Sequence, residues 1–140
     1  MLTVTRTTTG KYVVSILCET EIEKHLYVDK TIGLDLGIKL YFVTSDLEEI
    51  ENPKHYRRNL KKLSQTSKKL FRSVKGSNNR AKAKTKLARI YERITNLRDD
   101  FLHKLSTRLI RDKSIICIEG LRVANMVKNH KLALSIMDAS

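Results

Sequence analysis

Tryptophan is absent from this chain of 140 residues, and proline occurs only once. Its two cysteines, Cys18 and Cys117, have no spacing that suggests a zinc site or a disulfide framework. Both fall in apolar strand-like patterns, so we expect small buried side chains in a reducing, cytoplasmic setting. No apolar stretch approaches the roughly 18 residues that span a bilayer, so we expect no membrane partner.

A local deficit is more informative: no acidic residue occurs from Lys54 to Lys86. Residues 1–53 hold nine acidic and five basic residues, whereas residues 54–113 hold twenty basic and four acidic ones. Such a field favours a polyanion, either nucleic acid or an anionic membrane surface, although lysine-rich helix faces are often only solvated. With aromatics at 6%, we expect phosphate contacts rather than base stacking. The candidate residues are Lys54, Arg57, Arg58, Lys61, Lys62, Lys68, Lys69, Arg72, Lys75, Arg80, Lys82, Lys84 and Lys86.

Several apolar runs have the length and alternation of β-strands. They predict a hairpin over residues 2–18 and strands at 32–36, 40–44, near 48–51 and at 114–119. Helices separate the last two of these strands. This order is the opening of a ribonuclease H-like α/β (α+β) fold, in which three antiparallel strands precede a fourth that lies parallel to the first.

Two helices are predicted between those strands. Asn52 and Pro53 supply an N-cap side chain and a proline in the first turn, and Gly76 predicts the end of the first helix. A second helix begins near residues 77–80 and runs to about Asp112. Apolar seams at steps of three and four predict that the two pack as an antiparallel hairpin. The seams are Tyr56, Leu60, Leu63, Ser67, Leu70 and Val74, and then Leu87, Ile90, Ile94, Leu97, Phe101, Leu105 and Leu109.

Two of the predicted strands each carry one carboxylate. Asp35 alternates with Leu34 and Leu36 and so lies on the opposite face, with room left by Gly33 and Gly37 for something to approach the backbone; Glu119 ends the last apolar run. Open α/β sheets bind ligands outside the carboxyl ends of their strands. Hard cations such as Mg²⁺ or Mn²⁺ prefer carboxylate oxygens, so the pair is a candidate metal site. Either acid alone could instead be a capping or surface residue.

Six motifs occur in an order that resembles one family, the TnpB (OrfB) insertion-sequence transposases, which are RNA-guided nucleases with a RuvC-like region. The resemblance covers nearly the whole chain. It implies that Asp35 and Glu119 are catalytic, metal-binding residues of a Mg²⁺-dependent DNA endonuclease, with DNA and a guide RNA as partners. The motifs are Gly33-Leu-Asp-Leu-Gly-Ile-Lys39, Ile50-Glu-Asn-Pro-Lys54, Lys75-Gly-Ser-Asn-Asn-Arg80, Asn96-Leu-Arg-Asp-Asp-Phe-Leu-His-Lys-Leu-Ser106, Ile116-Cys-Ile-Glu-Gly-Leu121 and Met126-Val-Lys-Asn-His-Lys-Leu132.

The chain departs from the family pattern in three ways. The family has a third catalytic Asp on a later strand, and Asp138, in a weak predicted helix over 131–139, follows Glu119 too soon to match it. The family's zinc ribbon and N-terminal nucleic-acid-binding domains have no counterpart. We therefore expect a truncated nuclease domain with weak or absent metal binding, or a non-catalytic nucleic-acid-binding remnant. A sheet edge left bare by truncation predicts a homodimer.

Other assignments are less specific. Asn96, Arg98 and Asp99 interrupt the second helical seam and either face the catalytic cleft or form surface pairs. Residues 120–125 are predicted to be a loop. The expected organisation is a hairpin with its connector over 1–30, then a partial RuvC-like domain over 31–140 into which a helical hairpin, 54–112, is inserted.

Overall fold

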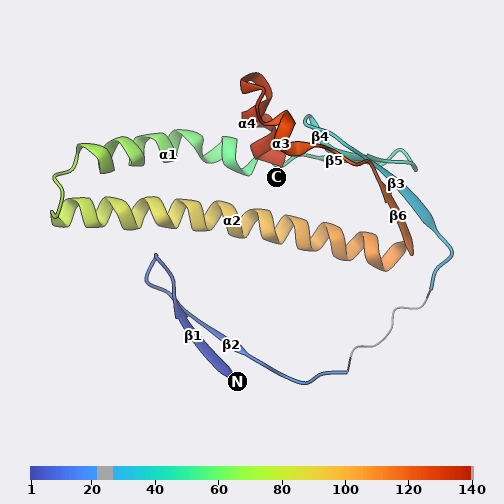
Figure 1. Ribbon diagram of the computed structural model, residues 1–140, viewed down its shortest axis with the longest axis horizontal. Helices are drawn as coiled ribbons and strands as arrows, with labels where there is room; N and C mark the ends of the chain where they lie inside the picture. The colour runs from blue at the N-terminus through green and yellow to red at the C-terminus, as the bar shows by residue number, and fades with distance from the viewer. Residues whose placement is uncertain (22–26, 140) are drawn as a thin grey trace. The chain divides into compact units, whose positions relative to one another are not determined.

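The computed structural model describes residues 1–21 and 27–139, so part of the predicted connector lies outside the described residues. Figure 1 shows the elements along the chain. They fall into two compact units. The hairpin unit comprises residues 1–24 and 59–96, and the sheet unit comprises residues 25–58 and 97–140. Among the described residues, no helix combines the length and the apolar character needed to cross a membrane.

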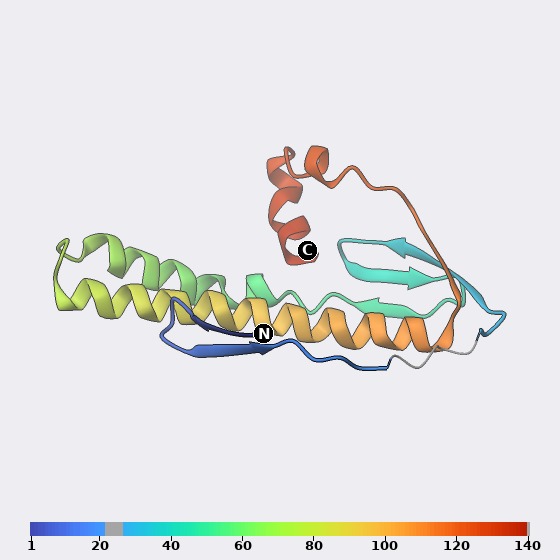
Figure 2. The same ribbon diagram turned by 60° about the horizontal axis from the view of Figure 1, so that its bottom comes forward.

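The sheet unit is built on four strands in the spatial order β5-β4-β3-β6, which Figure 2 shows from a second direction. Neighbours β3 and β4, like β4 and β5, are antiparallel, whereas β3 and β6 are parallel. The predicted mixed topology is confirmed, and the architecture is consistent with a ribonuclease H-like α+β fold. The strands span Thr31–Leu36 (β3), Leu40–Thr44 (β4), Glu49–Glu51 (β5) and Ile115–Ile118 (β6).

The core of the sheet unit lies on one face of these strands. Ile32, Leu34 and Phe42 are buried there, and Leu105 and Leu109 pack against them. These two leucines lie in the second half of helix α2 (Asn78–Asp112), on the predicted seam. Every second side chain of β3 therefore packs toward the helix, and the residues between them face away, as the two-residue period of a strand predicts.

Gly37 allows a tight connection from β3 to β4. A Cβ atom there would lie 2.9 Å from the backbone oxygen of Leu40, and the Gly37 N–H donates to the Tyr41 carbonyl over 3.2 Å. Next to Asp35 on the other side, the Gly33 N–H donates to Ser45 Oγ over 3.2 Å. What approaches the backbone at these glycines is thus the neighbouring strand of the same sheet.

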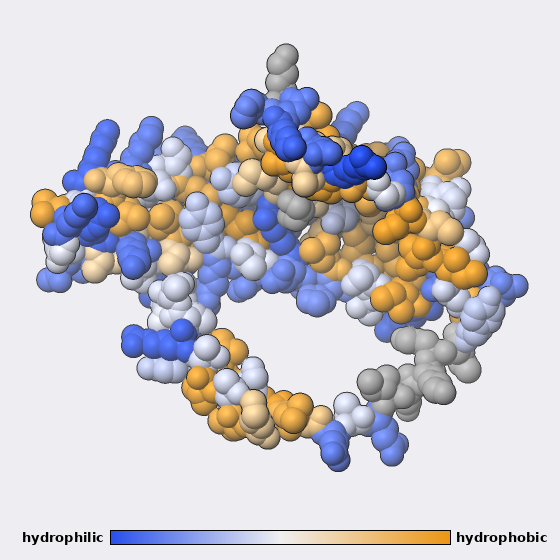
Figure 3. All heavy atoms as spheres, in the orientation of Figure 1, coloured by the Kyte–Doolittle hydropathy of each residue, from blue (hydrophilic) through white to orange (hydrophobic). Residues whose placement is uncertain are grey.

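The hairpin unit begins with strands β1 (Leu2–Arg6) and β2 (Tyr12–Ile16), which pair antiparallel as predicted. Their tip contacts α2: Thr9 Oγ1 donates to Glu92 Oε1 over 3.1 Å, and Lys11 Nζ lies 3.1 Å from Oε2 of the same residue. Every residue of the two strands is exposed, and Figure 3 shows apolar side chains on their visible face.

Helix α1 (His55–Arg72) and the first half of α2 pack as an antiparallel pair in the hairpin unit. The buried side chains include the predicted Leu63, Ile90 and Ile94, together with Thr66 and Ala83, which the apolar seam had missed because they are small or polar. The Ser77 hydroxyl accepts the Arg80 N–H and caps α2 where the sequence predicted its start.

Three details of the prediction are wrong. Helix α1 ends at Arg72, so Val74 lies outside it and is exposed; Gly76, with φ of +82°, belongs to the connection. A four-residue helix, α3 (Val123–Met126), occupies part of the predicted loop before α4 (His130–Ala139). Both cysteines are exposed, because Cys117 lies on the edge strand β6 and Cys18 follows a hairpin with two open faces.

Candidate active site and nucleic-acid interface

Asp35 and Glu119 lie at the same end of two neighbouring parallel strands: Asp35 is in β3, and Glu119 is the residue that follows β6. The last pair of the β3–β6 ladder joins Leu34 to Ile118, which makes Asp35 and Glu119 the next residue along each chain. Neighbouring strands lie about 4.8 Å apart, and residues in register share a face. Leu34 packs in the core, so Asp35, the next residue of β3, points to the opposite side. Glu119 is the first residue after β6, and both acids are exposed.

This carboxylate pair is available to a ligand. Within the described residues, neither side chain has a hydrogen bond or an ion pair with another side chain. Mg²⁺ is commonly held by one or two carboxylates and completes its shell with water or phosphate oxygens, so this donor set fits such a cation. The described residues contain no group of three acidic, histidine or cysteine side chains that could hold a metal.

An apolar cavity of about 190 Å³ opens where the chain leaves these strands. The segments that follow Asp35 and Glu119 form part of its wall, and helices α3 and α4 form the rest. Burial raises the pKa of the Tyr41 hydroxyl in this wall, which keeps that group neutral. The lining includes Leu36, Ile38, Leu121, Val123, Met126 and Ile136. No lining residue is charged, so the cavity itself offers no anionic ligand.

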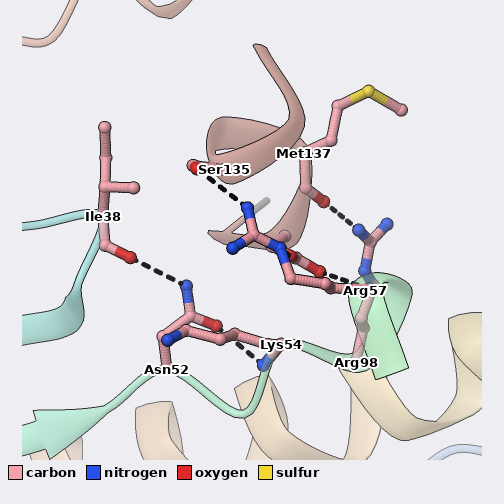
Figure 4. A network of polar contacts seen from close by, with 8 residues as sticks. Ile38, Asn52, Lys54, Arg57, Arg98, Ser135 and Met137 are labelled. Carbon is pink, nitrogen blue, oxygen red and sulfur yellow. Dashed lines mark hydrogen bonds and ion pairs between the residues drawn. The ribbon is translucent and has the colours of Figure 1, made fainter. Parts of the chain in front are cut away.

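Asp138, the other acid in the C-terminal part, is engaged elsewhere. Its side chain is 2% exposed; Oδ1 accepts the Arg57 N–H over 2.8 Å, and Oδ2 lies 3.2 Å from Arg57 Nε. Arg57 Nη2 also donates to Ser135 Oγ over 3.1 Å (Figure 4). An anionic acceptor at this position satisfies a first-turn N–H of α1, and its negative charge interacts favourably with the positive end of the helix dipole.

That contact corrects the predicted start of the first helix. Helix α1 begins at His55, and Asn52 is not its cap: Asn52 Oδ1 accepts the Lys54 N–H over 2.9 Å, while Nδ2 donates to the Ile38 carbonyl over 3.3 Å (Figure 4). Lys54 itself has φ of +50°. Asn52 therefore forms an Asx turn ahead of the helix, and the cap is supplied by Asp138.

The three predicted cleft residues differ in how exposed their side chains are. Arg98 is half-buried and donates to the Met137 backbone oxygen at the end of α4 (Figure 4). Asn96 and Asp99 are exposed. Arg98 therefore holds the last helix of the sheet unit, and a role in the cleft stays a prediction for all three.

The thirteen predicted nucleic-acid-binding residues divide between the units. Lys54, Arg57 and Arg58 belong to the sheet unit, and the other ten belong to the hairpin unit. Among the described residues, Arg57 is the member of this set that has an ion pair. Arg80 has a structural role, because its Nη1 donates to the Leu70 and Ser73 carbonyls at the end of α1. Among the described residues, the lysines from Lys61 to Lys86 have no ion pair.

Sequence reasoning missed the polar cluster around the start of α1. Burial lowers the pKa of His55, the positive charges of Arg58 and Arg98 lower it further, and Asp138 opposes them. The ring of His55 also stacks edge-on against Phe101, with 6.4 Å between centroids. No sequence signal could have found the Arg57–Asp138 contact, since 81 positions separate its partners.

The chain is similar to known proteins over most of its length. Residues 15–130 match the model of the OrfB family, described as "Probable transposase". The chain is 45% identical over 139 residues to a "Putative RNA-guided DNA endonuclease" of Streptomyces pristinaespiralis, which covers 99% of this chain and 35% of that protein. It is 36% identical over 121 residues to the "Putative RNA-guided DNA endonuclease InsQ" of Escherichia coli K12, with 86% and 30% covered. The chain thus spans about a third of the length of these curated relatives.

Proposed function

Because this chain belongs to the OrfB family of probable transposases, we propose that Asp35 and Glu119 are two ligands of a metal-dependent DNA-cleaving site. The observation that supports the proposal is the parallel register of β3 and β6, which brings side by side the strand ends at which the two exposed carboxylates lie. The relatives' names support DNA as the substrate and RNA as a partner. The basic side chains of helix α1 and of the first turns of α2 would bind the phosphate backbone of the nucleic acid.

In this proposal each part of the site has one task. A bound Mg²⁺ or Mn²⁺ would supply Lewis acidity toward a phosphodiester. Asp35 and Glu119 would hold the cation from one side, and their exposure leaves its other side open to phosphate oxygens and water. The strands fix the spacing of the two carboxylates through backbone hydrogen bonds, so the ligands are positioned before the cation arrives.

A second candidate function is nucleic-acid binding without cleavage. The observation that favours it is the donor set, which among the described residues comprises two carboxylates with no third acid beside them. Fewer anionic ligands mean weaker attraction for a divalent cation. The uncompensated charge of the hairpin unit does not depend on Asp35 or Glu119, so binding would survive their loss.

Cleavage of end-labelled single-stranded DNA with Mg²⁺ or Mn²⁺ tests the proposal. Asp35→Asn and Glu119→Gln, which keep the shape of each side chain but remove its charge, should each lower the cleavage rate at least about 100-fold. The matched control is Glu49→Gln, an exposed acid on β5 of the same sheet, which should cleave like the unchanged chain. Manganese binding measured by calorimetry gives a second readout.

The outcomes separate the two candidates. Cleavage and Mn²⁺ binding that both variants lose, and the control retains, support the metal site. DNA binding without cleavage in all four proteins, together with unchanged Mn²⁺ binding, contradicts the metal site and leaves the non-catalytic function. Cleavage that persists in both variants places the reaction elsewhere on the chain.

We also propose that the chain associates with a second copy through β6. This strand is the edge of the four-stranded sheet, and Ile115 and Ile118 on it are 45% and 65% exposed. An apolar edge with unpaired backbone groups favours strand pairing. Light scattering should show a dimer that Ile115→Lys converts to a monomer, whereas Ile110→Lys, on the exposed side of α2, should leave it intact. A monomeric unchanged chain would rule this association out.

A further inference from the structure

A groove of about 360 Å³ runs between the two helices of the hairpin unit. Its floor contains the buried side chains of Thr66 and Ala83, one from each helix. Four lysines and two amides complete the lining: Lys62, Lys69 and Gln65 from α1, and Lys82, Lys86 and Asn79 from α2. All four lysines are exposed. Figure 3 shows hydrophilic side chains projecting along these helices.

The lysines of this groove have no negative partner in the part of the chain that the structure describes. Among the described residues none of them has an ion pair, and the sequence has no acid from Lys54 to Lys86. The neighbours Lys82 and Lys86 lie one helical turn apart, a spacing at which like charges repel and weaken the helix. An anion in the groove would remove that repulsion, so the charge pattern favours a bound anion over an empty surface.

We propose that this groove binds the phosphate backbone of a nucleic-acid strand. The inference rests on the proposed function and deepens it, because it assigns the contact to one surface of the basic hairpin. Lys62 and Lys69 are seven positions apart on a helix, or about 10 Å. Phosphates of one duplex strand recur about every 3.4 Å of helix axis, and the path between them along the strand is longer, so the groove spans about two to three of them.

The lining also indicates which part of the nucleic acid is contacted. Lysine ammonium groups and the Gln65 and Asn79 amides donate hydrogen bonds to phosphate oxygens, and such contacts carry no sequence information. No aromatic side chain lines the groove, so it has no platform on which a base could stack. Positive walls that face one another suit a strand lying between them, whereas a flat anionic membrane would meet one convex face.

Binding of a fluorescein-labelled single-stranded oligonucleotide to the full chain, measured by anisotropy over a series of NaCl concentrations, tests the assignment. The groove variant changes Lys62, Lys69, Lys82 and Lys86 to Gln. The control variant changes Lys61, Lys68, Lys75 and Lys84 to Gln, which removes the same charge from exposed positions outside the lining. Losing two to three phosphate contacts, at about 0.7 each for a single strand, should lower the slope of log affinity against log salt by about 1.5 to 2 in the groove variant. The control slope should change by less than half as much.

A pair of single substitutions provides an independent test that keeps every lysine. Asn79→Asp introduces a negative charge into the groove, and Asn78→Asp introduces the same charge one position earlier, outside the lining. Both positions are in the first turn of α2, where an acid stabilises the helix, so neither variant should unfold. Asn79→Asp should weaken binding at least threefold more than Asn78→Asp does.

Each outcome has a distinct meaning. Equal losses in the groove and control variants would overturn the groove assignment and leave a diffuse electrostatic contact, with the proposed function intact. If the unchanged chain binds no oligonucleotide at any salt concentration, the proposed function itself fails. If vesicles that contain anionic phospholipid bind more tightly than the oligonucleotide and compete with it, the ligand is a membrane surface and the proposal is wrong.

Discussion

The two halves of helix α2 differ in whether their basic side chains have acidic partners. In the second half and just beyond it, several cations have carboxylate partners: Lys104 and Asp100 lie 2.7 Å apart, Arg108 and Glu48 lie 3.0 Å apart, and Lys113 and Asp46 lie 2.8 Å apart. In the first turns, from Asn78 to Lys86, no cation of the described chain has such a partner.

This difference separates two uses of positive charge. Apart from Lys11 and Glu92, the ion pairs of the described residues lie in the sheet unit, where the same half of α2 covers the strands with Leu105 and Leu109. Each exposed pair there contributes less than about 1 kcal/mol, but the balance removes net repulsion around the sheet. The lysines from Lys61 to Lys86 have no such partner among the described residues, and repulsion between neighbouring ones weakens the hairpin unit. The pairing of cations thus distinguishes two regions that the total charge of the chain does not.

Removing the buried carboxylate of the compensated region should have the largest effect on stability. Asp138→Ala leaves Arg57 without its partner and a first-turn N–H of α1 without its acceptor. We expect the free energy of unfolding, measured with urea, to fall by about 3 kcal/mol. Asp138→Asn retains a hydrogen-bond acceptor and should cost about half as much.

Asp112→Asn is the matched control, because Asp112 is an exposed acid at the end of α2. It should change the free energy of unfolding by less than about 0.5 kcal/mol. Equal effects of Asp138→Ala and Asp112→Asn would mean that the Arg57–Asp138 pair adds nothing to stability. The distinction between compensated and uncompensated regions would then lose its energetic basis.

Lowering the pH should also reduce the free energy of unfolding, but by less than Asp138→Ala does. Burial and the nearby Arg58 and Arg98 lower the pKa of His55 below 6.5, so the unfolded chain takes up a proton that the folded chain resists. Stability due to the neutral ring is present above pH 6.5 and is lost as the pH falls below it. The loss is at most about 1.4 kcal/mol per pH unit.

Urea unfolding at about pH 7.5 and about pH 5.5 measures this dependence. His55→Gln should reduce the difference between the two values. His103→Gln, which alters an exposed histidine of α2, should leave the difference unchanged. If the two variants respond identically to pH, His55 is not the group that titrates, and the cationic cluster around it does not influence folding.

Local patterns predicted much of this molecule. The alternation around Asp35 identified β3 and its outward carboxylate, and the apolar run before Glu119 identified β6. The steps of three and four in α2 identified the side that meets the sheet. These assignments succeed because strand and helix periods are properties of a few consecutive residues, which a buried face then selects.

The sequence by itself determined the strands, the two long helices apart from the ends of the first, the mixed order of the sheet and the excess of positive charge. Tertiary structure alone decided that Asp138 caps α1 in place of Asn52, that Cys117 is exposed on an edge strand, and which lysines share a groove. The physical reason is distance along the chain. A cap, an edge or a groove depends on which surfaces meet, and partners 81 residues apart leave no mark on the local period of either segment.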